Sequence, residues 1–179
     1  TPLPRLLEGR SIAVVLGDGG VGKTTVSAAL AAVAAASGRR VLCVTVDPAN
    51  RLRDSLGLSG RFGIEEPVSL DGFPCAPGTA GSLSAMILDA ATELDRLVRR
   101  MAPSPEVVDR ITKNDFYRKA ATRMTGTHEY LAMERLLDAS ESGRYDLVVL
   151  DTPPERHALD FLDAPDRLGD LLGNDLFRM

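Results

Sequence analysis

Two short apolar segments near the start of the chain have the length and composition of buried β-strands. Residues 11–16 (SIAVVL) and 41–46 (VLCVTV) are apolar almost throughout, so both faces of each strand are expected to be covered. The alanine-rich segment 21–37 between them favours a helix, with Gly38 as a cap after its last turn. A strand, a helix and a strand within about 35 residues form a βαβ unit, which predicts a parallel sheet.

The middle of the chain is dominated by helical patterns. Apolar side chains recur at intervals of three and four over residues 83–101, which predicts an amphipathic helix. Pro103 and Pro105 end this helix and start a second, short one. Residues 128–142 predict a third helix. Residues 83–142 are therefore expected to form a helical subdomain inserted between strands of the sheet.

The remaining segments complete the expected α/β architecture. Residues 57–81 are rich in Gly and Pro, which predicts loops with one strand near Val68, and residues 146–150 (DLVVL) predict another strand. A helix is expected near Asp166. Three clear strands are fewer than a doubly wound sheet usually has. We therefore expect residues 1–179 to be a single domain that forms the N-terminal portion of a longer protein.

Composition and charge exclude several classes of protein. The 179 residues are 44% hydrophobic and 26% charged, which is typical of a soluble globular domain. The net charge of −4 argues against a broad nucleic-acid-binding surface, so no nucleic-acid partner is expected. No apolar stretch reaches about 18 residues, so no membrane-spanning helix is expected. Residues 1–10 lack the apolar core of a signal peptide.

The cysteines and histidines do not suggest a metal or redox site. Cys43 lies inside the second apolar segment, and Cys75 is not spaced from it as in a CxxC motif. His128 and His157 show no spacing that is typical of metal ligands. A reduced Cys43 in the core predicts a cytoplasmic location.

The most specific motif follows the first apolar segment directly. Residues 17–24 (GDGGVGKT) fit the pattern G-x-x-x-x-G-K-[ST] of a phosphate-binding loop. A chance match in a glycine-rich turn is the alternative, but the strand predicted before the motif and the helix predicted after it are the context that this loop requires. Backbone N–H groups of the glycines can turn toward phosphate oxygens, and the helix adds its positive N-terminal end. The sequence therefore predicts that ATP and Mg²⁺ bind here.

Within this loop each residue type suits one part of the nucleotide. Lys23 is expected to reach the β- and γ-phosphates and to serve catalysis, Thr24 to ligate Mg²⁺ through its hydroxyl, and Thr25 to bond the α-phosphate. The residues expected to bind ATP are Gly19, Gly20, Val21, Gly22, Lys23, Thr24 and Thr25.

Two aspartates follow predicted strands in the same manner. In open α/β sheets, ligands bind at the carboxyl ends of the strands, so Asp47 and Asp151 are expected at one edge. Asp151 is expected to hold Mg²⁺, directly or through water. Asp47 is the predicted catalytic residue that orients the water attacking the γ-phosphate. Each aspartate has an alternative role in a turn, because Pro48 follows Asp47 and Pro153 follows closely on Asp151.

Three segments together resemble the ArsA-type ATPases, a family that includes the ATPase of arsenite pumps and the factor that delivers tail-anchored membrane proteins. Residues 17–25 (GDGGVGKTT) are similar to the family's deviant Walker A motif, GKGGVGKTT. Residues 47–57 (DPANRLRDSLG) are similar to its switch I pattern, DPAH-x-L-x-D. Residues 151–165 (DTPPERHALDFLDAP) are similar to its switch II. Bacterial members of the family come closest to these motifs.

The resemblance implies an ATP-hydrolysing molecular switch. ATP closes a dimer of identical or related subunits, hydrolysis opens it, and the helices present a surface to a protein client or a membrane partner. The resemblance also implies that Asp47 positions the attacking water, that Asp54 belongs to switch I, and that Asp151 and the residues after it sense the γ-phosphate. The adenine-binding loop is expected beyond Met179.

The sequence departs from the family pattern at several positions. Asp18 stands where the family has its signature lysine, and Asn50 replaces the histidine of switch I. A carboxylate about 6 Å from the γ-phosphate would be repelled by about 3 kcal/mol per charge at an effective dielectric of about 20, so Asp18 is expected to face away from its own phosphate site. Arg156 is then a candidate source of the missing positive charge. The family's paired cysteines are absent from this stretch, so arsenite pumping is not supported.

Other functions stay open. A nucleotide-binding regulator without hydrolysis is favoured by Asp18, whereas a ParA/MinD-like positioning ATPase is disfavoured by the segments resembling switch I and switch II. Four methionines of the helical region are candidates for lining an adaptable apolar groove, although ordinary core packing is the stronger interpretation. They are Met86, Met101, Met124 and Met133.

Overall fold

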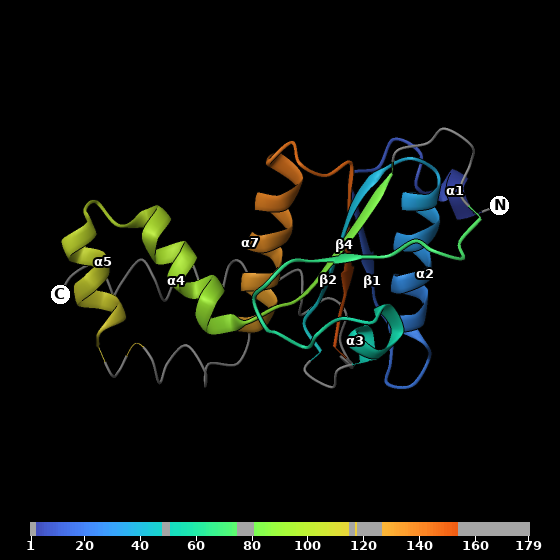
Figure 1. The fold of residues 1–179 in the computed structure, drawn as a ribbon. Coiled ribbons are helices and arrows are strands. Elements are labelled where there is room, and N and C mark those ends of the chain that lie inside the picture. The colour runs from blue at the N-terminus through green and yellow to red at the C-terminus, as the bar shows by residue number, and fades with distance from the viewer. Residues whose placement is uncertain (1–2, 48–50, 75–80, 115–116, 118–126, 154–179) are drawn as a thin grey trace. The chain divides into compact units, whose positions relative to one another are not determined.

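The computed structural model describes residues 3–47, 51–74, 81–114, 117 and 127–153 of the chain (Figure 1). Within these residues a five-stranded sheet has the strand order β1-β5-β2-β4-β3. Four of its strands are parallel, and β3 alone runs antiparallel to its neighbour β4. The predicted α/β architecture with a mainly parallel sheet is confirmed. The strands are β1 (Ile12–Val15), β2 (Arg40–Thr45), β3 (Glu66–Val68), β4 (Ser82–Ile87) and β5 (Leu147–Asp151).

Helices accompany this sheet along the chain. The βαβ unit expected near the N-terminus is present as β1, α2 and β2, but its two strands are not neighbours, because β5 pairs with both of them. The helices are α1 (Leu3–Leu6), α2 (Lys23–Ala36), α3 (Arg51–Leu56), α4 (Ala90–Met101), α5 (Pro105–Thr112) and α7 (Thr127–Glu141).

Central strands explain the continuous apolar segments of the sequence. Residues 41–44 of β2 and 147–150 of β5 are completely buried, as expected for strands covered on both faces. The same expectation holds less well for the first apolar segment, because Val14 in β1 and Leu16 just after it are 37% and 40% exposed. In the described part of the sheet β1 lies at the end of the strand order, so it has one strand neighbour rather than two.

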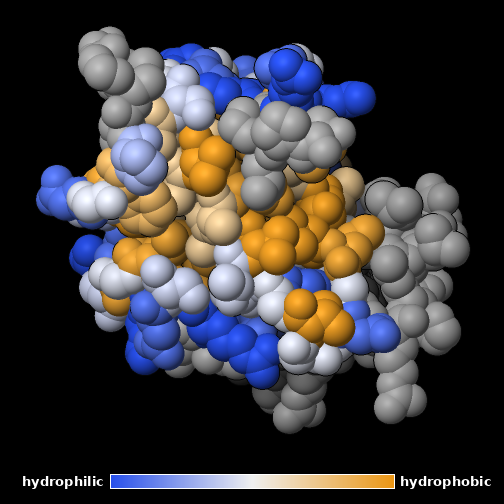
Figure 2. Space-filling view, turned by 90° about the vertical axis from the view of Figure 1, so that its right-hand side faces the viewer, coloured by the Kyte–Doolittle hydropathy of each residue, from blue (hydrophilic) through white to orange (hydrophobic). Residues whose placement is uncertain are grey.

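Helix α2 has apolar residues on both its buried and its exposed sides. Ala28, Ala31 and Ala35 are at most 8% exposed and belong to the core cluster that includes residues of β2 and β5. Leu30 is partly buried and packs against the same cluster, whereas Val26 is 47% exposed. Figure 2 views the molecule from the side on which α2 lies in Figure 1, and apolar surface gathers at its centre. This composition explains why the helix shows little contrast between its faces.

The predicted helix over residues 83–101 is wrong in its first part. Residues 82–87 form β4, and the helix α4 begins only at Ala90, where the Asp89 side chain accepts a hydrogen bond from the backbone N–H of Thr92 at 3.0 Å. Because β4 pairs with β2 and is buried from Leu83 to Ile87 apart from Ser84, its apolar residues are continuous rather than alternating. A short continuous apolar segment does not distinguish a buried strand from a buried helix.

A second compact unit begins at Asp89 and continues to Met133 in the sequence. It contains α4, α5 and the beginning of α7, which matches the helices expected from residues 105 and 128 onward. Inside this unit the Tyr117 hydroxyl donates a hydrogen bond to Asp95 at 2.9 Å. Its apolar cluster comprises Ala90, Leu94, Leu97, Val98, Val108, Tyr117 and Leu131.

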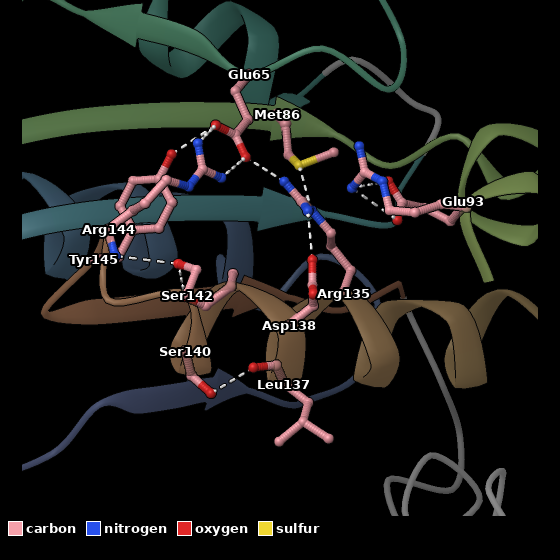
Figure 3. Close-up of polar contacts among 12 residues, drawn as sticks. Glu65, Met86, Glu93, Arg135, Leu137, Asp138, Ser140, Ser142, Arg144 and Tyr145 are labelled. Atoms are coloured by element: carbon pink, nitrogen blue, oxygen red, sulfur yellow. Dashed lines mark hydrogen bonds and ion pairs between the residues drawn. The ribbon is translucent and has the colours of Figure 1, made fainter. Parts of the chain in front are cut away.

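A group of charged side chains joins α7 to the sheet in the first unit (Figure 3). Arg135 is 5% exposed, and its guanidinium donates hydrogen bonds to Glu65 and, at 3.2 Å, to Asp138. Glu65 also accepts hydrogen bonds from Arg144 and from the Tyr145 hydroxyl, both at 2.7 Å. A loop residue before β3 thus binds one side chain of α7 and two residues that lead into β5.

Three of the four methionines considered for an apolar groove lie among the described residues. Met86 is 1% exposed inside the sheet, whereas Met101 is 50% exposed at the end of α4 and Met133 is partly buried in α7. Met124 lies outside the described residues. None of the helices in the described ranges is long and apolar enough to cross a membrane.

Candidate functional site

The glycine-rich loop between β1 and α2 forms one wall of the candidate site. Gly20 and Gly22 have positive φ angles of 79° and 90°, a region that favours glycine over residues with a side chain. The carbonyl of Gly22 accepts a hydrogen bond from the backbone N–H of Val26 at 2.9 Å. The loop therefore turns directly into the first turn of α2, where unpaired N–H groups and the helix dipole favour an anion.

Lys23 is the first residue of α2 and is held against this loop. Its side chain is nearly buried, with 8% exposure, and its Nζ donates a hydrogen bond to the backbone carbonyl of Asp18 at 2.8 Å. A cation in this position lies at the anion-binding end of the helix. The arrangement suits a lysine that binds phosphate oxygens.

Asp151, the last residue of β5, lies at the centre of a cluster of hydroxyl groups. It is completely buried. Its Oδ2 accepts hydrogen bonds from the hydroxyls of Thr24 at 2.9 Å and Thr45 at 3.1 Å. Its Oδ1 accepts a hydrogen bond from the Ser27 hydroxyl at 3.1 Å. Residues of α2, β2 and β5 thus meet at a single carboxylate.

The environment of Asp151 suits a cation. Burial, the largest cause, raises the pKa of Asp151, and the charge of Asp47 adds to this effect, while the hydrogen bonds from the three hydroxyls lower the pKa. The ionised carboxylate would therefore be stabilised by a nearby positive charge. Carboxylate and hydroxyl oxygens are ligands that Mg²⁺ takes from proteins, together with water and phosphate oxygens. Thr24 and Asp151 therefore fit a magnesium site.

Asp47 follows β2 at the same edge of the sheet. Its backbone N–H donates a hydrogen bond at 3.1 Å to the Thr45 hydroxyl, which itself donates to Asp151. The Asp47 side chain is 12% exposed and lies 3.9 Å from the guanidinium of Arg51, the first residue of α3. Thr45 therefore connects the positions of the two aspartates.

These groups surround a pocket with a volume of about 370 Å³. This volume lies within the range of about 300–1,000 Å³ that is typical of small-molecule sites. One wall comes from the loop and α2, and the other comes from the end of β2, from α3 and from the residue after β5. The lining residues are Gly20, Gly22, Lys23, Thr24, Thr25, Asp47, Arg51, Asp54, Ser55 and Thr152.

Most of the residues predicted from the sequence lie together at this pocket. Asp47 lines it, and Asp151 lies next to it through its bond with Thr24. Gly19 and Val21 belong to the same loop, but they are not among the lining residues, and Val21 is 64% exposed. Asp54, which the resemblance placed in switch I, also lines the pocket.

Five residues at this site were not singled out from the sequence. Arg51, Ser55 and Thr152 line the pocket, whereas Ser27 and Thr45 bond Asp151. Only Ser27 carried a usable signal, because it follows Thr24 by three positions and so lies on the same face of α2.

Asp18 belongs to the loop between β1 and α2. It is exposed and is absent from the residues that line the pocket. This position agrees with the repulsion expected between its carboxylate and a bound γ-phosphate. Only its backbone carbonyl, which accepts the Lys23 hydrogen bond, takes part in the site.

Of the other residues considered in the sequence, Cys43 and His128 lie among the described residues, and several others do not. Cys43 is a free thiol buried in β2, and burial raises its pKa well above the usual range, so it suits the core role expected for it. His128 is exposed in α7. Predictions that fall outside the described residues concern Pro48, Asn50, Cys75, Arg156, His157, the helix near Asp166 and most of the segment that resembles switch II.

The chain is similar in sequence to a known family of proteins. Residues 10–177 match the family model described as anion-transporting ATPase. An ATPase ASNA1 homolog from Paramecium tetraurelia is 30% identical over 167 residues, which cover 91% of this chain and 46% of that protein. The ATPase GET3 of Malassezia globosa is 30% identical over 165 residues, which cover 91% of this chain and 45% of that protein.

A further relative, the ATPase get3 of Aspergillus terreus, is 33% identical over 150 residues, which cover 83% of this chain and 41% of that protein. The chain thus spans about half the length of the curated relatives that it matches. These three relatives come from Paramecium tetraurelia, Malassezia globosa and Aspergillus terreus, and the expected similarity to bacterial members stays a prediction.

Proposed function

Because the chain belongs to the anion-transporting ATPase family, we propose that it binds ATP with Mg²⁺ at the pocket beside α2 and hydrolyses the ATP to ADP and phosphate. The observation that supports this proposal most is the hydrogen bond between Thr24 and Asp151. It places a hydroxyl and a buried carboxylate, both suited to Mg²⁺, next to Lys23 at the anion-binding end of a helix.

Each residue has a defined part in this proposal. The loop from Gly19 to Gly22 and Thr25 bind phosphate oxygens, and Lys23 stabilises the charge on the β- and γ-phosphates. Thr24 and Asp151 hold Mg²⁺, which neutralises phosphate charge when it is bound. Asp47 orients a water for attack on the γ-phosphate. Its side chain suits this role because it is nearly buried and lines the pocket.

We further propose that residues 1–179 act as one ATPase domain with an inserted helical subdomain, within a dimer of identical or related subunits. The nucleotide state would then control a surface that binds a protein client or a membrane partner. Relatives named as GET3 and ASNA1 ATPases support a switch of this kind. A cytoplasmic location would provide ATP and would keep the Cys43 thiol reduced.

The test uses the full chain and measures ATP affinity by calorimetry and phosphate release in a steady-state assay. We expect Lys23→Ala to weaken ATP binding at least tenfold, because a charge-assisted contact to phosphate is lost. Its melting temperature should stay close to that of the wild type. Lys113→Ala is the matched control. This lysine directly follows α5, is 76% exposed and forms an ion pair with Asp109 of α5.

Unchanged ATP affinity in the Lys23→Ala protein would exclude this pocket as the nucleotide site. A second function, a nucleotide-binding regulator without hydrolysis, is favoured by Asp18, because a carboxylate stands in the loop beside the single lysine. Tight ATP binding by the wild type without phosphate release would establish this second function instead.

A further inference from the structure

Two cationic side chains are among the residues that line the pocket, Lys23 and Arg51. Lys23 comes from α2, and Arg51 comes from α3 on the opposite wall. Asp18 adds a negative charge to the loop and lies outside the pocket. An ATP that entered the pocket would therefore meet one cation from the loop side and one from the side of Asp47.

The orientation of α3 is fixed by its apolar residues. Leu52 is 1% exposed and belongs to the core cluster, and Leu56 packs against the same cluster. The opposite face of the helix carries three residues that line the pocket, Arg51, Asp54 and Ser55. They share this face because Asp54 and Ser55 follow Arg51 by three and four positions. Burial of Leu52 thus directs Arg51 toward the pocket.

The local charges leave Arg51 suited to a new partner. Asp54 accepts two hydrogen bonds from its neighbour Arg53, both at 2.9 Å, so its charge is already compensated. Arg51 is held more loosely. Among the described residues its ion-pair partner is Asp47, at a distance of 3.9 Å, and its side chain is 58% exposed. A guanidinium in such a position can bind phosphate oxygens in a bidentate manner.

We propose, on the basis of the proposed function, that Arg51 is a second phosphate-binding residue that contacts the terminal phosphate of ATP. Arg51 and Asp47 share the wall that faces the loop, so a terminal phosphate placed between the walls competes with Asp47 for the guanidinium. Transfer of Arg51 from the carboxylate to the phosphate leaves Asp47 to accept a proton from the attacking water. Recognition of the third phosphate by Arg51 is thereby coupled to the ability of Asp47 to accept a proton.

This role predicts that Arg51 distinguishes ATP from ADP. ADP lacks the terminal phosphate, so it keeps the contacts to the loop, Lys23 and Thr24 but not the contact to Arg51. We expect Arg51→Ala to weaken binding of ATPγS with Mg²⁺ at least tenfold and binding of ADP with Mg²⁺ less than threefold. Calorimetry on the full chain measures both constants.

Two further variants sharpen this experiment. Arg51→Lys keeps the charge but not the planar fork, so we expect it to recover part of the lost ATPγS affinity. Arg61→Ala is the matched control, because Arg61 has a similar exposure of 65% but lies outside the pocket. It should leave both constants unchanged. Circular dichroism and melting curves check the fold, and Arg51→Gln replaces the alanine variant should that variant unfold.

The outcomes separate this proposal from the function on which it rests. Equal weakening of ATPγS and ADP, or no weakening of either, would overturn the role of Arg51 while the nucleotide site stands. If the wild type bound neither nucleotide, the site itself would be wrong and the role of Arg51 would fall with it. A selective loss of ATPγS affinity in Arg51→Ala, absent in Arg61→Ala, would establish the proposal.

Discussion

The Thr24 hydroxyl donates a hydrogen bond to the Asp151 carboxylate at 2.9 Å, although 127 residues separate them in the sequence. The bond connects the first turn of α2 to the end of β5. Asp151 is fully buried and is surrounded by hydroxyl groups of Thr24, Ser27 and Thr45. A substitution of Asp151 should therefore weaken the binding of a cation beside Thr24 more than it weakens direct contacts with the nucleotide.

The first prediction concerns Asp151→Asn. The amide keeps a hydrogen-bond acceptor for the hydroxyls but removes the charge that would hold Mg²⁺. We expect the variant to need at least tenfold more Mg²⁺ for half-maximal ATP binding, since a coordinating charge is lost. Fluorescence titration with Mg²⁺ at a fixed nucleotide concentration measures this shift.

Stability without nucleotide provides the control for this variant. Burial raises the pKa of Asp151, so the ionised carboxylate does not stabilise the fold by itself. The free energy of unfolding of Asp151→Asn without Mg²⁺ should stay within about 1 kcal/mol of the wild type. A normal Mg²⁺ requirement in a stable variant would argue against Asp151 as a magnesium residue.

The second prediction separates binding from hydrolysis at Asp47. An amide in Asp47→Asn aligns and accepts from a water poorly, so we expect hydrolysis to slow at least tenfold, within the range of about 10²–10⁴ typical of a lost base. ATP affinity should be retained. Phosphate release under saturating ATP measures the rate, and calorimetry measures the affinity.

Asp54→Asn is the matched comparison, because Asp54 also lines the pocket but is held by Arg53. It should slow hydrolysis much less than Asp47→Asn. Normal turnover in Asp47→Asn would mean that another residue orients the water, and the segment that resembles switch II would be the next place to search.

The third prediction compares Asp18→Lys with Asp18→Ala. Asp18 is exposed and lies outside the pocket, so Asp18→Ala should bind ATP as the wild type does. Asp18→Lys adds a cation to the loop. We expect its steady-state ATPase rate to exceed the rates of the wild type and of Asp18→Ala. Loss of hydrolysis in Asp18→Ala with binding intact would instead make Asp18 itself catalytic.

The fourth prediction concerns the cluster around Glu65, shown in Figure 3. Glu65→Gln removes the charge that faces Arg135, which is 5% exposed. Among the described residues, Arg135 keeps its ion pair with Asp138. Loss of one partner of a buried ion pair costs about 3–5 kcal/mol. Glu65 is 23% exposed, so we expect a smaller loss of about 2 kcal/mol in the free energy of unfolding at pH 7. Chemical denaturation measures it.

The pH dependence of this difference has a definite sign. Burial alone would raise the pKa of Glu65, but hydrogen bonds from Arg144 and Tyr145 and the nearby arginine charges lower the pKa below its ordinary value of 4.5. The wild type therefore keeps its advantage above pH 4.5 and loses it as the pH falls through the lower folded pKa. Asp109→Asn removes one partner of an exposed pair and should leave the stability close to that of the wild type. A constant difference at all pH values would contradict the ion pair.

Local sequence patterns were sufficient to predict the elements whose structure depends on neighbouring residues. The loop before α2 was predictable because glycines, Lys23 and Thr24 are contiguous, and the phosphate-binding geometry depends on a short stretch of backbone. The strands β2 and β5 were predictable because both are buried on both faces and therefore apolar throughout. Residues 83–87 of β4 were assigned to a helix because a short apolar segment fits a strand or a helix equally well.

The tertiary structure decided which distant residues meet. Pairing of β5 between β1 and β2 brings Asp151 to the hydroxyls of Thr24 and Thr45, and no periodicity in the sequence specifies this strand order. Burial of Leu52 directs Arg51 into the pocket, which is a consequence of how α3 packs rather than of the motif around it. The sequence by itself determined the phosphate-binding loop and the α/β class, because these depend on neighbouring residues. Packing determined that Arg51, Ser55 and Thr152 join Asp47 in the second wall of the pocket, because these residues come from separate elements that only the folded sheet holds together.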